Sequence, residues 1–114
     1  LAWNINNKLD FQLSYSLEQF QIKVTRKKVE ELLNFTMFEY DDVTNKVHYY
    51  LIKNKEAGKL LIAECPAIDY FLFIHEKDMV DTADIVSKLR SVPSILAVFK
   101  LNPEELASTE NIFF

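Results

Sequence analysis

Three segments of this chain would be apolar on both faces if they formed strands. Tyr70–Ile74 and Ile95–Phe99 are apolar at every position, and in residues 47–52 only His48 is polar. Because successive side chains of a strand point to opposite faces, a sheet with one face in water shows alternating apolar and polar residues. These segments do not alternate, so they predict a sheet that is covered on both faces.

The length and composition favour a single folded domain over residues 1–114. Compact domains cluster at about 100–150 residues. The chain has 114 residues, of which 49% are hydrophobic and 13% aromatic, which is enough to form a core. The charged fraction is 26% and the net charge is −4, unlike the charge-rich and apolar-poor composition of disordered chains.

Two segments have the periodicity of amphipathic helices. In Lys8–Phe20, apolar residues recur every three to four positions and would form one stripe along a helix. In Asp81–Val92, acidic residues stand in the first turn and basic residues in the last, which suits the helix dipole, and Pro93 follows. The apolar stripe of the first predicted helix consists of Leu9, Leu13, Leu17 and Phe20.

The remaining apolar segments have the length of strands. The clearest pair, Phe35–Tyr40 and Lys46–Asn54, flanks the turn-forming residues Asp41–Asn45 and predicts a β-hairpin. Val29–Leu33 is compatible with a short helical turn or with a connection. The other expected strands are Ile22–Thr25, Leu60–Glu64, Asp69–His75 and Ser94–Leu101.

The order of these elements predicts the fold class. Short turns between most strands favour antiparallel neighbours. Residues 69–101 read as a C-terminal strand–helix–strand unit, whose crossover is expected to be right-handed. The expected fold is therefore α+β, with a single, mostly antiparallel sheet of five to six strands and two helices packed on one face.

Two helices of this length cover roughly one face of such a sheet, so the second face needs another cover. The candidates are the ends of the chain, a second copy in a homodimer, or a different protein. Alternatively, tyrosine rings lie along the surface with their hydroxyls in water. If a protein partner covers the face, the expected contact residues are Tyr49, Tyr50, Tyr70, Phe71 and Phe73.

Residue counts exclude several classes of site. Gly58 is the only glycine, whereas phosphate-binding loops and dinucleotide fingerprints need several. Cys65 is the only cysteine, so the chain forms neither an internal disulfide nor a cysteine-rich zinc site. No apolar run approaches the ~18 residues of a membrane-spanning helix. We therefore expect no cofactor, no metal and no membrane association, and the single thiol without a bridge fits a reducing compartment.

Residues 61–72 resemble a family signature. Ile62, Glu64 and the pair Ile68-Asp69 correspond to the isoleucine, glutamate and Val-Asp of the signature IPExxVD. Ala63 stands in place of the signature proline, and one additional residue precedes the Val-Asp position. Three further segments resemble the first helix, the hairpin and the ending of the same family, namely Gln12–Leu17, Phe38–Asn54 and Ser108–Phe114. The chain thus resembles the IPExxVD family of small bacterial proteins, largely from the Bacteroidetes, which implies a cytoplasmic protein and no known activity.

Four titratable side chains are candidates for chemistry. Glu64 and Asp69 flank a break at Pro66, and two convergent carboxylates can perform acid–base catalysis or bind a hard metal. The simpler interpretation is that Asp69 bonds backbone N–H groups at the break. His48 and His75 each lack a ligand partner two or four positions away, which favours packed or surface histidines. We therefore assign no catalytic residue.

The only basic cluster consists of Lys23, Arg26, Lys27 and Lys28. Such a cluster can bind the phosphates of RNA, but no stacking aromatic accompanies it and the whole chain is acidic. Lysines of this kind are also typical of edge strands that are protected against pairing with other chains. The predicted function is a non-enzymatic protein-interaction or adaptor domain that acts through an apolar sheet face. The alternative is an RNA- or ribosome-associated factor that uses the basic cluster.

Overall fold

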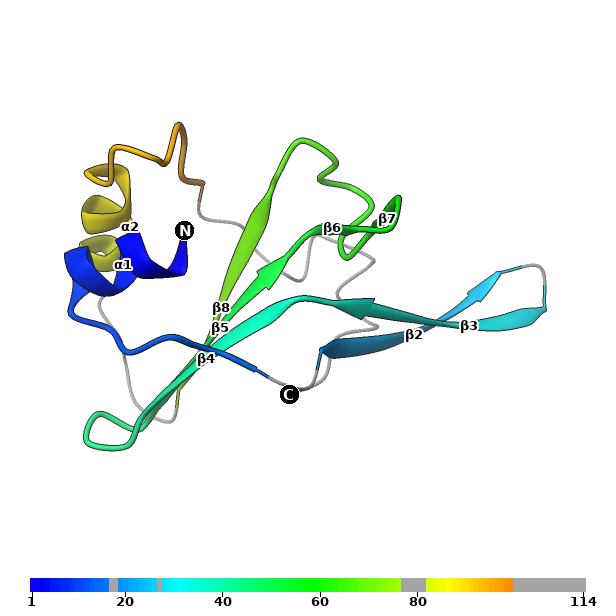
Figure 1. The fold of residues 1–114 in the computed structure, drawn as a ribbon, viewed down its shortest axis with the longest axis horizontal. Helices are drawn as coiled ribbons and strands as arrows, with labels where there is room; N and C mark the ends of the chain where they lie inside the picture. The colour runs from blue at the N-terminus through cyan, green and yellow to red at the C-terminus, as the bar shows by residue number, and fades with distance from the viewer. Residues whose placement is uncertain (17–18, 27, 77–81, 100–114) are drawn as a thin grey trace.

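The structure is a computed structural model, and it describes residues 1–16, 19–26, 28–76 and 82–99. Within these residues the chain forms two helices and eight strands (Figure 1). In chain order they are α1 (Ala2–Leu9), β1 (Ser14–Tyr15), β2 (Phe20–Arg26), β3 (Val29–Phe35), β4 (Met37–Asp42), β5 (Val47–Lys53), β6 (Lys55–Glu56), β7 (Lys59–Leu60), β8 (Tyr70–Glu76) and α2 (Thr82–Arg90).

The centre of the molecule is a four-stranded antiparallel sheet in the order β1-β4-β5-β8. The predicted hairpin is confirmed as β4 and β5, and the strand predicted at Asp69–His75 is confirmed as β8. The carboxylate of Asp42 closes the β4–β5 turn, because it accepts hydrogen bonds from the backbone and the side-chain amide of Asn45, at 3.2 and 2.8 Å.

Strands β2 and β3 form a separate two-stranded sheet, which Figure 1 shows as an arm that extends away from the helices. We call this hairpin the arm. A single residue, Thr36, separates β3 from β4, so the chain passes directly from the arm into the central sheet. Val29–Leu33 is therefore part of a strand, and both alternatives predicted for it, a short helical turn and a connection, are wrong.

The prediction of a single sheet is wrong, because the described strands divide into three sheets. The third sheet is the short β6–β7 hairpin, whose two-residue loop is Ala57-Gly58. Both loop residues have positive φ, 49° and 75°, as a type I′ turn requires. Of the strand predicted at Leu60–Glu64, only Leu60 is in a strand, and it lies in β7.

The first predicted helix is also wrong in position, since α1 ends at Leu9 instead of beginning near it. The helix stops because Asp10 adopts a left-handed conformation with φ 56°, and the side chain of Asn6 then holds the backbone N–H and C=O of Leu13. Of the predicted apolar stripe, Leu9 and Leu13 lie in one hydrophobic cluster, whereas Phe20 lies in a second cluster. Leu17 lies outside the described residues.

The second predicted helix is confirmed as α2, with an ion pair between Lys88 and Asp84 at 3.1 Å. Asp81 lies outside the described residues. The strand predicted after α2 is wrong for residues 94–99, which are not in a strand. The guanidinium of Arg90 donates to the carbonyl of Val98 at 3.1 Å, so this segment is attached to the helix and not to a neighbouring strand.

The core has two clusters, one on each face of the central sheet. The helix-side cluster joins α1 and α2 to β5, with Ile5, Leu51 and Leu89 among its buried residues. The arm-side cluster joins the base of the arm and residues 61–62 to the opposite face, with Phe35 and Ile52 at its centre. Both faces are thus covered over part of their area, as the pattern of apolar segments predicts.

Candidate interaction surface

The five predicted contact residues do not share one face. Tyr49 and Tyr70 point into the helix-side cluster, whereas Tyr50, Phe71 and Phe73 lie on the arm side. Tyr49 and Phe71 are buried, and the other three are half-buried. The set therefore does not form a continuous aromatic patch on the surface.

The second face of the sheet is covered in part by internal segments of the chain. The predicted covers were the chain ends, a second copy or another protein. Instead, Phe20, Ile22, Leu33 and Phe35 from the arm pack against Ile52 in the middle of the sheet. At the N-terminus, Ala2 and Ile5 cover the helix-side face. The residues 112–114, which were the other candidate cover, lie outside the described residues.

One buried polar side chain, Asn54, holds the loop that completes this cover. Its amide nitrogen donates to the carbonyls of Cys65 and Ile68 at 2.9 and 2.8 Å. Its amide oxygen accepts from the backbone N–H of Ile62 at 2.9 Å. Asn54 is fully buried, so these bonds satisfy groups that water cannot reach. Nothing in the sequence pattern singled out this residue.

A large open groove runs beside β8, with a volume of about 920 Å³. The residues along β8 form one side of it. Residues 94–99 and the helix α2 form the other side, through apolar side chains that include Ile85, Leu89 and Ile95. The lining is mainly apolar, and its acidic or basic side chains are Asp69 and His75, at opposite ends of β8.

β8 is the last strand in the order β1-β4-β5-β8 of the described central sheet. Edge strands are usually protected by shortness, by lysine or proline, or by bulges. β8 has seven residues and contains no lysine, arginine or proline. The opposite edge of the same sheet, β1, is protected because it has only two residues. The sequence alone shows that residues 70–76 contain no lysine, arginine or proline.

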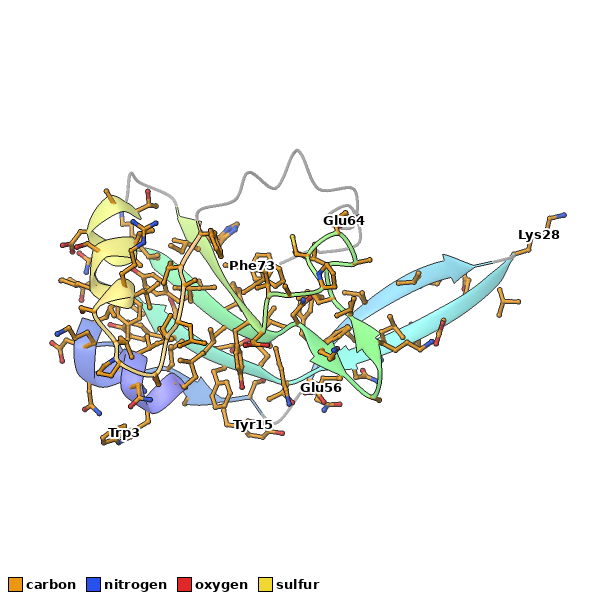
Figure 2. All side chains as sticks on the ribbon, turned by 90° about the horizontal axis from the view of Figure 1, so that it is seen from above. Trp3, Tyr15, Lys28, Glu56, Glu64 and Phe73 are labelled. Carbon is orange, nitrogen blue, oxygen red and sulfur yellow. The ribbon has the colours of Figure 1, made fainter. Side chains whose placement is uncertain are left out.

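The segment opposite β8 also exposes large apolar side chains. Ile95 and Val98 pack against the helix-side cluster, but Leu96 is fully exposed and Phe99 is 64% exposed. Figure 2 shows that Phe73 of β8 lies in the body of the molecule, between the helices and the arm. We call the edge of β8, the groove and residues 94–99 the edge groove.

Two tyrosines near the sheet have raised pKa values. Burial is the main cause for Tyr50, and the negative charges of Glu39 and Asp41 add to it. Burial also raises the pKa of Tyr40, together with the charges of Asp42 and Asp10. Both phenols therefore stay protonated at neutral pH and keep a hydrogen-bond donor.

Asp41, His48 and His75 lie in one row across three neighbouring strands. The ring of His48 stacks on Tyr50 at 4.2 Å, and within the described part of the chain its buried Nε2 has no hydrogen-bond partner. The row forms no metal site, since no group of three metal-ligating side chains with suitable geometry occurs among the described residues.

The two candidate carboxylates, Glu64 and Asp69, are both exposed and lie at the two ends of the loop that Asn54 holds. The bond at the break is made by the backbone, since the carbonyl of Asp69 accepts from the N–H of Asn54 at 2.9 Å. The sequence predicts a hydrogen bond from the side chain of Asp69 to backbone N–H groups. In the structure, the backbone carbonyl of Asp69 makes the hydrogen bond at this break.

The basic cluster lies at the distal half of the arm, with Lys28 at its tip (Figure 2). Lys23 pairs with Glu30 at 3.0 Å, and Arg26 stands opposite Val29 in the ladder. Lys27 lies outside the described residues. An acidic residue of β3 therefore pairs with Lys23, so the described part of the cluster is not uniformly positive.

Comparisons with known proteins identify no relative. No protein-family model, no curated protein and no solved structure matches the chain. The resemblance to the IPExxVD family therefore stays a prediction. Neither of the two helices in the described ranges, α1 and α2, is long and apolar enough to cross a membrane.

Proposed function

We propose that this chain is a non-enzymatic protein-interaction domain that binds an extended segment of a partner protein in the edge groove. The observation that carries the proposal is the position of β8 at the end of the strand order β1-β4-β5-β8, with no charged residue or proline in its first five positions, beside a groove of about 920 Å³. An added strand would form main-chain hydrogen bonds with β8, and its side chains would fill the groove.

The lining of the groove defines the chemistry of the partner segment. The groove has apolar walls on both sides of β8, with Ile85 and Leu89 on the helix side and Ile62 and Ile68 on the other. A segment that fits is therefore apolar at successive positions, not only at alternate ones. Asp69 at one end favours a basic residue there, because the groove lining holds no lysine or arginine.

The proposal is tested with a labelled peptide of the sequence Lys-Thr-Val-Ile-Val-Phe-Val-Thr-Lys, measured by fluorescence anisotropy. We expect saturable binding with a dissociation constant of roughly 10–100 µM, since a short strand loses conformational entropy when it is ordered. A control peptide with proline at the central position removes a ladder donor and should not bind.

A matched pair of variants locates the binding site. Phe73→Lys places a protecting residue on β8 and should weaken binding at least tenfold. Leu32→Lys makes the same change at an exposed apolar position of the arm and should leave binding unchanged. Equal binding by the Phe73→Lys variant, or equal binding of the proline peptide, would overturn the proposal. So would the absence of binding to the unaltered chain.

A further inference from the structure

The arm contributes side chains to the core of the body, although it belongs to a separate sheet. Ile22, Leu33 and Phe35 at its base are buried in one cluster with Ile52 and Ile62 of the body. The body therefore needs an arm in this position, because Ile52 and Ile62 lose apolar cover without it. An arm of the same sequence from a second copy of the chain meets the same requirement.

The arm joins the central sheet at a point where the chain changes its strand partner. Phe35 pairs with β2, whereas Met37 pairs with β5, and a single residue, Thr36, stands between them. Aromatic and β-branched residues favour extended backbone, and neither glycine nor proline marks this junction. Local preference therefore favours one uninterrupted strand from Val29 to Asp42, and tertiary contacts keep its two parts in separate sheets.

The β6–β7 hairpin supplies two of these tertiary contacts, and we call it the clasp. The carboxylate of Glu56 accepts a hydrogen bond from the backbone N–H of Thr36 at 3.2 Å, and Lys59 pairs with Glu31 of β3 at 3.6 Å. Figure 2 shows Glu56 at the base of the arm, far from Lys28 at its tip. The first contact fixes the junction itself, and the second fixes the arm on the body.

We infer that two copies of this chain exchange their arms, so that the junction at Thr36 straightens and the arm of each copy packs on the body of the other. The contacts at the base of the arm re-form between copies, because the same side chains meet the same partners. The bond from Thr36 to Glu56 belongs to the closed chain alone, whereas the pair of Lys59 and Glu31 forms in both states. The inference goes beyond the proposed function, because the edge groove takes no part in the exchange.

The covalent connection between arm and body sets the concentration at which exchange occurs. The body meets its own arm at an effective concentration of roughly 1 mM, as is usual for short connections. Because closed and exchanged arms make the same core contacts, the dimer of the unaltered chain should have a dissociation constant of about this value. Each dimer contains two junctions, so a change at the junction acts twice on this constant.

The first test measures the dissociation constant of the dimer by light scattering, after each protein is incubated until the dimer fraction is constant. Glu56→Ala removes the contact that is specific to the closed chain and should lower this constant roughly tenfold. Lys59→Ala is the matched control, because its ion pair forms in both states, and it should leave the constant unchanged. Thr36→Val strengthens the preference for an extended junction and should lower the constant roughly threefold, which keeps the test available if Glu56→Ala does not fold.

The second test distinguishes arm exchange from a dimer that associates through surfaces. Dimers of Glu56→Ala with ordinary and with heavy-nitrogen labelling are mixed, and native mass spectrometry follows the dimers of mixed mass. A surface dimer with a dissociation constant of about 100 µM separates in well under a second at typical association rates. Arm exchange requires buried side chains to leave the core, so mixing should take on the order of hours.

Tighter association of Glu56→Ala or Thr36→Val, with Lys59→Ala unchanged and with slow mixing, supports arm exchange. Equal association of Glu56→Ala and Lys59→Ala overturns it, as does mixing within seconds. The absence of a dimer in every variant at roughly 1 mM protein also overturns it. Each of these results leaves the binding of the strand peptide to be decided by its own experiment, so failure of the exchange is distinct from failure of the proposed function.

Discussion

The arm and the strand β8 both lie at the margin of a described sheet, but they differ in the side chains that protect strand edges. The arm carries charges of both signs near its tip, including Lys23 and Glu30, which form an ion pair at 3.0 Å. β8 has none of these residues along its first five positions and lies beside an apolar groove. Since unprotected edges invite pairing, this difference is the reason for proposing β8, and not the arm, as the edge that binds a partner.

The largest effect on stability is expected at the base of the arm, because side chains there are buried in the core, whereas Val29 and Leu32 further along the arm are exposed. Phe35 is completely buried in the arm-side cluster. Phe35→Ala should therefore lower the free energy of unfolding by about 4 kcal/mol, measured by urea denaturation.

Leu32 provides the matched control for this variant, since it lies in the same strand but is exposed. Leu32→Ala should change the free energy of unfolding by no more than about 0.5 kcal/mol. Similar losses at both positions would show that the arm is packed on both faces, and the contrast with β8 would disappear.

The next effect concerns Asn54, which supports the loop between β7 and β8. Asn54→Ala removes three hydrogen bonds. The carbonyls of Cys65 and Ile68 and the backbone N–H of Ile62 each lose their bond to the Asn54 side chain. The expected loss is about 3 kcal/mol in thermal or urea unfolding.

The exposed amide of Asn45 is the control for Asn54, because it also bonds within a turn but in contact with water. Asn45→Ala should cost less than about 1 kcal/mol. If Asn54→Ala is equally mild, the loop does not depend on the buried amide, and the second face of β8 is covered in another way.

These elements show which parts of the fold follow from local pattern. The β4–β5 hairpin, β8 and α2 could be predicted, because strand-prone runs, turn residues and helix-end charges lie next to one another in the sequence. The bend at Thr36, which divides the sheets, has no glycine or proline to mark it. The position of α1 was missed because Leu9 and Leu13 keep helical spacing across a turn.

The surface was harder to predict than the elements. The contact residues were chosen for aromatic character, but which strand is at the edge depends on sheet order, and which face is covered depends on the arm. Tyr49 and Phe71 are buried for this reason. The rule that assigns a protecting role to Lys23 also applies to residues 70–76, which contain no lysine, arginine or proline.

A smaller effect of pH is expected where the arm joins the body. Hydrogen bonding to Thr36, first through its side chain and also through its backbone N–H at 3.2 Å, holds the pKa of Glu56 below its ordinary value. Lys53 lowers this pKa further, while burial opposes the shift. The lowered folded-state pKa stabilises the fold above the ordinary carboxyl pKa, and this contribution is lost as the pH falls through the folded-state value.

The measurement is the melting temperature of the unaltered chain and of Glu56→Gln between pH 7 and pH 3. The unaltered chain should be the more stable of the two at pH 7, and the difference should shrink in acid. A difference that is constant over this range would mean that the ionised carboxylate does not fasten the arm to the body.

The smallest effect on stability, and the sharpest test of the comparison, is expected for the pair Lys23 and Glu30. Both side chains are about 60% exposed, so a double-mutant cycle should give a coupling of only about 0.2–0.5 kcal/mol. Replacing both by threonine keeps strand propensity and removes the charges from the arm. The variant should then unfold at nearly the same urea concentration but associate at concentrations where the unaltered chain does not, as light scattering would show. If it stays dispersed, charge is not what keeps the arm apart, and the distinction from β8 must lie in the groove alone.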